Sequence, residues 1–138
     1  MTKSFELLEH IADVRILAKG SDFNNLFSAA LSGLCEVIIP GWQMRAKELI
    51  IFKKLKIESV DITSLLIDFL SEVLSLSHQD KCLFCEVKFE HLAESSLEAE
   101  IRGFEVEKFE EDVKAVTYHE AEVVSIDGVY QTMIVLDI

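Results

Sequence analysis

Two stretches that repeat apolar side chains every three or four residues constrain the fold more than any other feature of this sequence. The spacing predicts a helix over residues 21–38, with Ser21 as its N-cap, and a second helix over residues 61–77. Pro40 and Gly41 follow the first stretch and are a typical stop signal. The apolar stripe of the second helix is wide enough to lie across a sheet, so the rest of the chain has to supply one.

Most of the remaining chain alternates apolar and polar residues, as strands with one buried face do. Asp127-Gly128 is a strong hairpin signal, because both turn positions tolerate positive φ. We predict a single domain over residues 1–138 of the α+β class, in two layers, with two helices packed on a largely antiparallel or mixed sheet. The expected strands are residues 5–8, 14–18, 48–57, 85–89, 97–101, 113–124 and 129–137.

The bulk properties indicate a cytoplasmic protein. A chain of 138 residues suffices for one domain with its own core. Charged residues interrupt every apolar run before it reaches the roughly 18–20 residues that a membrane span needs. The first residues lack the pattern of a signal peptide. Three cysteines are an odd number, and reduced thiols in the cytoplasm are the simplest interpretation.

The charge restricts the class of partner. The chain carries 25 acidic and 13 basic residues, for a net charge of −12. Nucleic-acid binding depends on basic residues that displace counterions from phosphates, so we expect no tight binding to bare RNA or DNA. Residues 86–112 hold ten acidic and three basic residues. This stretch is either a solubilising surface or a face that meets a basic protein or gathers cations.

No local motif identifies a catalytic site. Cys82-x-x-Cys85 matches half of a zinc site, but no second pair follows, and buried core cysteines are the preferred interpretation. The sequence has no glycine-rich phosphate loop, nucleophile elbow or paired-histidine metal motif. The four histidines are widely dispersed: His10, His78, His91 and His119.

Carboxylates at the two ends of the chain are more suggestive. Asp13 begins an expected strand, and Asp137 and the α-carboxylate of Ile138 end another. If these strands lie side by side, three oxygen-bearing groups converge at one edge of the sheet. Oxygen ligands select hard cations such as calcium, magnesium or manganese. The residues alone leave open a second interpretation, in which these are two unrelated surface aspartates.

Four blocks of the sequence resemble the archease family, in the family's order and across nearly the whole chain. His10-Ile11-Ala12-Asp13 with Gly20 is similar to the opening H-T-A-D…G. Residues 65–74 resemble the central L-L-x-D-W-L-S-E-L-L helix, and residues 113–119 match the strand V-K-A-V-T-Y-H. The final Val-Leu-Asp-Ile is similar to the family's V-x-D-I ending.

The resemblance implies a function and a set of site residues. Archeases are small cytoplasmic α+β proteins that activate the GTP-dependent tRNA-splicing RNA ligase, by promoting its guanylylation and multiple turnover, and do not catalyse the reaction themselves. By position, the family's metal ligands correspond here to Asp13, Asp137 and Ile138. The expected cofactor is calcium, with magnesium or manganese as alternatives, and the expected partner is the RNA ligase.

Some positions depart from the family pattern. Ile11 stands where the family has Thr, Phe69 replaces Trp, and Phe109 stands where a His is frequent. Two matched residues have more than one interpretation. Lys114 either pairs with the acidic stretch or faces the ligase, and His119 either packs along a strand or caps a backbone group.

Two alternative functions are kept. A chaperone-like adaptor would suppress aggregation of unrelated proteins without any need for Asp13. A stand-alone metal-dependent phosphoester hydrolase would turn over a small phosphoester without any partner protein.

Overall fold

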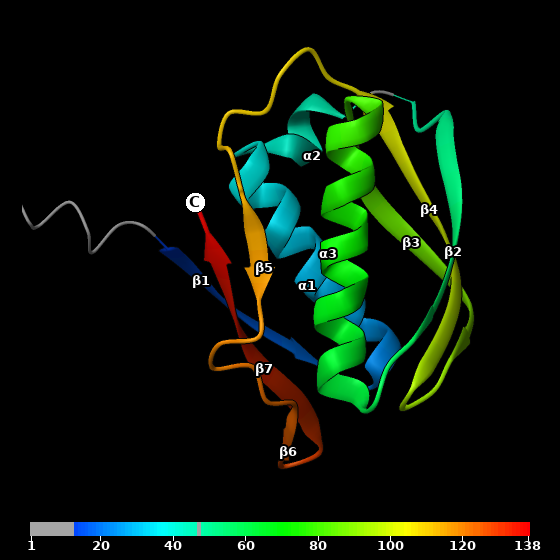
Figure 1. The fold of residues 1–138 in the computed structure, drawn as a ribbon, viewed down its shortest axis with the longest axis vertical. Coiled ribbons are helices and arrows are strands. Elements are labelled where there is room, and N and C mark those ends of the chain that lie inside the picture. Colours follow the sequence, from blue (N-terminus) through cyan, green and yellow to red (C-terminus); the bar gives the residue numbers. More distant parts are fainter. Residues whose placement is uncertain (1–12, 47) are drawn as a thin grey trace, which may run out of the picture.

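The computed structural model describes residues 13–46 and 48–138, which form three helices and seven strands (Figure 1). The strand expected over residues 5–8 and the block from His10 to Ala12 lie outside the described residues. The elements in chain order are β1 (Asp13–Gly20), α1 (Phe23–Ile38), α2 (Trp42–Arg45), β2 (Ile51–Glu58), α3 (Ile62–Asp80), β3 (Cys82–Leu92), β4 (Ser96–Glu105), β5 (Ala115–Thr117), β6 (Val124–Ile126) and β7 (Val129–Asp137).

The strands form two antiparallel sheets. In the first sheet β7 lies between β1 and β5, and β6 also pairs with β7. In the second sheet β4 lies between β2 and β3. The α+β class and the antiparallel pairing are confirmed. The division into two sheets differs from the single sheet predicted, because alternation along a strand carries no information about which strands pair. The short helix α2 was not predicted either.

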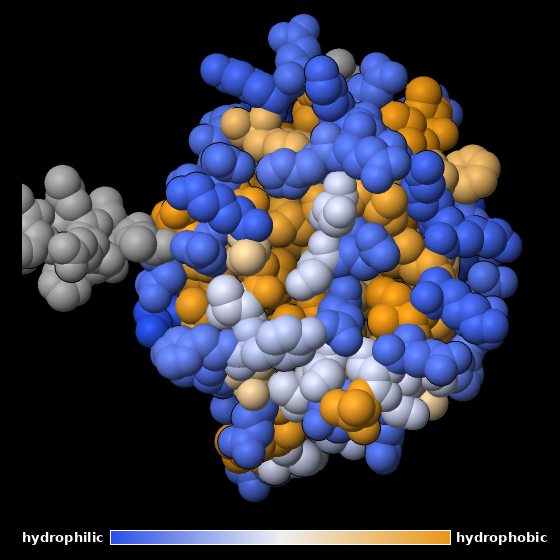
Figure 2. Space-filling model, in the orientation of Figure 1, coloured by the Kyte–Doolittle hydropathy of each residue, from blue (hydrophilic) through white to orange (hydrophobic). Residues whose placement is uncertain are grey.

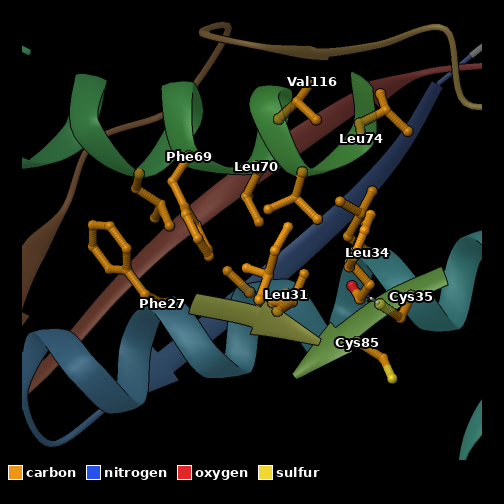
Figure 3. Packing of buried hydrophobic residues seen from close by; sticks show 14 of the residues in the cluster. Phe27, Leu31, Leu34, Cys35, Phe69, Leu70, Leu74, Cys85 and Val116 are labelled. Atoms are coloured by element: carbon orange, nitrogen blue, oxygen red, sulfur yellow. Dashed lines mark hydrogen bonds between the residues drawn. The ribbon is translucent and has the colours of Figure 1, made fainter. Parts of the chain in front are cut away.

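The two long helices pack against both sheets. α1 contacts β1 of the first sheet and β3 of the second, and α3 contacts β3 and β5. In Figure 3 side chains from the two helices point toward one another and fill the space between them. The rings of Phe27 and Phe69 lie 5.8 Å apart at their centroids, and Phe89 of β3 lies 5.6 Å from Phe69. Aromatic pairs at this spacing add to the stability that their burial provides.

Both long helices begin at an aspartate. The side chain of Asp22 accepts a hydrogen bond from the backbone N–H of Asn25 at 2.7 Å, and Asp61 accepts one from Ser64 at 2.7 Å. Each bond satisfies one of the free N–H groups of a first helical turn. The N-cap of α1 is therefore Asp22, and the prediction of Ser21 is wrong by one residue. The stop signal is confirmed, since α1 ends at Ile38.

Gly20 allows β1 to run into α1 at very short range. A Cβ atom at this position would lie 2.2 Å from the backbone nitrogen of Leu26. Any side chain would force the strand and the helix apart. This close approach explains why a glycine ends the first strand.

The hairpin at Asp127-Gly128 is confirmed. Both residues adopt positive φ, 52° and 80°, as a tight two-residue turn requires. The predicted strand over residues 113–124 is wrong in its length, however. It is interrupted between β5 and β6 by a turn in which Glu120 has a φ of 61° and the N–H of Ala121 donates to the carbonyl of Tyr118. No helix that the structure describes is long and apolar enough to cross a membrane.

Candidate metal site at the end of the first sheet

Asp13 and Asp137 lie directly opposite each other, at the start of β1 and the end of β7. Residues that pair in this way point their side chains to the same face of the sheet, with Cβ atoms roughly 4.5–5.5 Å apart. The next pair, Val14 and Leu136, belongs to the core, so the two carboxylates emerge on the opposite, outer face. The fold thus brings together two of the three predicted ligands.

The third predicted ligand, Ile138, follows β7 at the same end of the sheet. β5 flanks it, because Ala115 pairs with Asp137 and the N–H of Lys114 donates to the carbonyl of Asp137 at 2.7 Å. The side-chain ammonium of Lys114 then donates to the backbone oxygen of Ile138 at 3.2 Å. Neither interpretation of Lys114 from the sequence anticipated this contact, which holds the end of the chain beside the two aspartates.

The chemistry of these donors fits a hard cation. Asp13 and Asp137 offer carboxylate oxygens, and Ile138 offers a backbone oxygen, the ligand type that calcium, magnesium and manganese prefer. Within residues 13–46 and 48–138 no three His, Cys, Asp or Glu side chains cluster closely enough to hold a metal ion. Among the described residues, a third protein oxygen for such a cation would therefore have to come from the backbone, and Ile138 is the predicted donor.

Arg15 lies between two carboxylates next to this site. Its Nη1 donates to Oδ1 of Asp13 at 3.0 Å, and its Nη2 and Nε donate to the two carboxylate oxygens of Glu120 at 2.7 and 3.4 Å. All three side chains are about 40% exposed. The guanidinium therefore contacts Glu120 at two points and Asp13 at one.

The ionisation of these groups reflects the same contacts. The hydrogen bond to Glu120 is the main cause that raises the pKa of Arg15, and the charge of Asp13 adds to it. The hydrogen bond from Arg15 in turn lowers the pKa of Glu120. Both groups stay charged at neutral pH, so the ion pairs persist there.

The described histidines lie apart from one another. His119 is in the turn after β5, 70% exposed, with Nε2 at 3.2 Å from Oε2 of Glu120, so it does not pack along a strand. The Nε2 atom of His91 is within hydrogen-bond distance of Ser96 Oγ, and the ring of His78 packs on Phe109. The three histidines thus have different partners: Glu120, Ser96 and Phe109.

The cysteines are buried in the core, as predicted. Cys35, Cys82 and Cys85 are free thiols with at most 5% of their surface exposed. Burial raises the pKa of Cys82 to about 12 and that of Cys85 to about 11, and it also raises the pKa of Cys35. Thiols that stay protonated are poor zinc ligands and poor nucleophiles.

An open groove of about 510 Å³ runs between α3 and the segment over residues 112–116. Leu74 and Val113 are among its apolar lining residues, and His78, Asp112 and Lys114 are among the polar ones. Figure 2 shows hydrophobic side chains along both sides of α3, bordered by hydrophilic ones. Lys114 lines the groove and also contacts Ile138, but neither Asp13 nor Asp137 lines it, so the groove is separate from the candidate metal site.

Comparison with known proteins decides the family. The profile of the archease protein family matches residues 5–138. This chain belongs to the archease family. The archease of Methanosarcina mazei is 31% identical over 144 aligned residues, which cover 99% of this chain and 97% of the relative. The archease of Pyrococcus abyssi is 33% identical over 144 aligned residues, which cover 99% of this chain and 99% of the relative.

Solved structures agree with this assignment to the archease family. The solution structure of protein 1598 from Methanobacterium thermoautotrophicum superposes with a TM-score of 0.74 at 28% identity, and the match covers 92% of this chain and 93% of that one. The crystal structure of a Thermotoga maritima protein, described as an archease and possible chaperone, gives a TM-score of 0.70 at 21% identity and covers 100% of this chain and 98% of that one. At that identity the second likeness supports the fold alone.

Two of the archease-like blocks contact each other through Asp68 and Tyr118. Asp68 is on α3, and its carboxylate accepts hydrogen bonds from the hydroxyl of Tyr118, just after β5, and from that of Ser59 at 2.5 Å. The contact raises the pKa of the Tyr118 phenol. Asp68 thereby ties the turn that carries His119 and Glu120 to the central helix of the archease fold.

The departures from the archease pattern have structural explanations where the structure describes them. Phe69 is fully buried and packs against two other phenylalanines, so it fills a core position that the usual Trp would also fill. The ring of Phe109 lies 5.1 Å from that of His78 on α3. Phe109 therefore packs onto the helix, and an aromatic contact with His78 holds the segment before β5 there. Ile11 is outside the described residues.

Sequence reasoning missed Arg15, Glu120 and Asp68. The only signal for Arg15 was its spacing of two from Asp13, which places both side chains on one face of a strand. Asp68 is the Asp of the archease-like block over residues 65–74, but its contact could not be foreseen because it depends on the packing of α3 against β5. Glu120 carried no signal, because its contact depends on a turn.

Proposed function

We propose that this archease binds a divalent cation, calcium foremost, and activates a GTP-dependent tRNA-splicing RNA ligase in the cytoplasm by promoting its guanylylation and multiple turnover. The protein acts as an activator and is not itself the catalyst. The observation that carries the proposal is the pairing of Asp13 with Asp137 in a chain that belongs to the archease family. Magnesium and manganese remain alternative cations.

Asp13, Asp137 and Ile138 would hold the cation. In a chain that ends at Ile138, this residue offers a carboxylate, and the site then carries three negative charges. A bound divalent cation supplies positive charge that polarises phosphate or carboxylate oxygens near it. β1 and β7 hold the aspartates, and the backbone N–H of Lys114 holds Asp137 beside β5. The ammonium of Lys114, 3.2 Å from the backbone oxygen of Ile138, would have to share that oxygen with the cation or move away from it.

The charge of the protein supports a protein partner. With a net charge of −12, the chain is repelled by RNA, and it would not compete with the ligase for its substrate. An RNA ligase has to present cationic surfaces to phosphates. An acidic activator is attracted to such surfaces, and this attraction speeds the encounter and orients the two proteins.

A chaperone-like role is the second candidate, favoured by the description of the Thermotoga maritima structure as a possible chaperone. Several apolar side chains are more than half exposed, among them Leu17 at 52% and Phe52 at 59%. Exposed apolar residues are what a holdase uses to capture unfolded clients.

Two assays separate the candidate functions. The first measures RNA ends joined by a tRNA-splicing ligase present in substoichiometric amount, with and without this archease. The proposal predicts that the archease raises the number of turnovers per ligase molecule. The second measures aggregation of an unrelated heated client. Suppressed aggregation without any effect on ligation would support the chaperone role and contradict the proposal.

A further inference from the structure

We infer that Arg15 and Glu120 form a latch that regulates cation binding at Asp13: Arg15 competes with the cation for the Asp13 carboxylate, and Glu120 draws Arg15 away from it. The inference rests on the proposed metal site, and it names two residues that are not ligands but set its affinity. The basis is the position of one guanidinium between two carboxylates.

The contacts of Arg15 are unequal. Two of its nitrogens contact the two oxygens of Glu120, at 2.7 and 3.4 Å, whereas one nitrogen contacts Asp13, at 3.0 Å. Two parallel N–H···O bonds are the geometry in which a guanidinium binds a carboxylate best. When a cation occupies Asp13, Arg15 gives up the single contact and keeps the paired one, so its charge remains neutralised.

Arg15 competes with a cation for Asp13 in two ways, through its positive charge and through its hydrogen bond to the carboxylate. Asp13 Oδ1 accepts a hydrogen bond from Arg15, and the positive guanidinium also repels any cation that approaches the same carboxylate. Arginine stays protonated throughout the physiological range, so the competing charge is permanent. Arg15 therefore lowers the affinity of the site for a cation.

The turn that carries Glu120 is built to hold it against Arg15. Glu120 adopts a φ of 61°, a conformation that residues other than glycine rarely adopt. The neighbouring Tyr118 is anchored to Asp68 of α3, which fixes the start of the same turn. A disfavoured backbone conformation at a residue with this contact indicates that the surrounding structure imposes the position of Glu120.

The test is calcium titration by isothermal calorimetry on the full chain and four variants. Arg15→Gln should bind calcium roughly two- to five-fold more tightly, the effect of one exposed ion pair. Glu120→Gln should bind calcium more weakly by a similar factor, because Arg15 loses its ion pair with Glu120 and its contact with Asp13 becomes more populated. The variant with both changes should match Arg15→Gln alone, since Glu120 acts only through Arg15.

Lys19→Gln is the matched control for long-range charge. Lys19 is an exposed base on the same face of the same strand, four residues after Arg15. At physiological salt, charges separated by more than about 8 Å are largely screened, so this variant should bind calcium like the wild type. Melting curves in a chelator confirm that all variants are folded.

The outcomes separate this inference from the proposed function. Wild-type protein that binds no calcium contradicts the proposed metal site and the latch together. Wild-type binding with an unchanged or weaker Arg15→Gln variant contradicts the latch alone. If Glu120→Gln still weakens binding when Arg15 is already replaced, Glu120 acts directly on the cation and the latch is wrong.

Discussion

Asp13 and Asp137 are near opposite ends of the sequence, yet they face each other as the last antiparallel pair of β1 and β7, at one end of the first sheet. Like charges directly opposite each other are destabilising in a sheet. In this structure Arg15 offsets part of that repulsion through its contact with Asp13. A bound cation would offset more of it, so the pair is suited to a site that binds one.

Asp13→Asn and Asp137→Asn should each lower the affinity for calcium by about ten-fold or more, because hard-cation binding depends strongly on the number of carboxylates. Both side chains are at least partly exposed at the edge of the sheet, so the fold should persist. Calorimetric titration measures the affinity. Glu94→Gln removes one exposed carboxylate from the turn between β3 and β4 and should leave calcium binding unchanged. If all three variants lowered the affinity equally, the net charge of the protein, and not a site at Asp13 and Asp137, would explain calcium binding.

An added C-terminal peptide tests Ile138. In a chain that ends at Ile138, the extension turns a carboxylate into a neutral amide, removes one charge and adds bulk beside Asp137. Calcium should bind more weakly to the extended protein than to a protein with the same peptide at its N-terminus. Equal affinity of the two tagged proteins would exclude the α-carboxylate of Ile138 as a ligand.

The cysteines should have no part in metal binding. Replacing Cys82 and Cys85 together by Ala removes two buried thiols and should lower the free energy of unfolding by about 1 kcal/mol per site. The calcium affinity should not change, and zinc should not raise the melting temperature of the wild type through these residues. A loss of metal binding in this variant would support the interpretation of Cys82 and Cys85 as zinc ligands.

The same thiols predict a dependence of stability on pH. Their folded-state pKa values, about 12 and about 11, lie above the ordinary value of 9. A pKa raised on folding contributes stability below the unfolded value, and that stability is lost as the pH rises from about 9 through the folded value. Denaturant unfolding at a series of alkaline pH values should therefore show a smaller loss for the double Ala variant than for the wild type.

Much of this fold is predictable from local pattern, and the exceptions have identifiable causes. Apolar spacing predicts both long helices because each buries one face, and Asp127-Gly128 predicts the hairpin because few residue pairs accept two positive φ angles. The break at Glu120 is not predictable from local pattern, because the side chains of this turn make their contacts with distant elements, Glu120 with Arg15 on β1 and Tyr118 with Asp68 on α3. The pairing of strands into two sheets depends on the packing of the helices between them.

Part of the candidate site is likewise predictable from the sequence, and part depends on how the elements pack. The resemblance of the terminal blocks to the archease family predicts Asp13, Asp137 and Ile138 as ligands, and the register of β1 and β7 places the two aspartates together. The contact between Lys114 and Ile138 could not be read from the sequence, because it requires β5 to lie beside β7. The role of Asp68 likewise depends on how α3 packs against β5.

The most direct test of the account is the number of RNA molecules joined per molecule of ligase, measured with the ligase limiting and GTP and metal in excess. We expect the wild-type archease to raise this number well above one, and the Asp13→Asn variant to raise it much less at the same concentration. Incorporation of labelled GTP into the ligase should change in parallel. A ligase that turns over equally well with and without this protein, or equally well with both variants, would contradict the account.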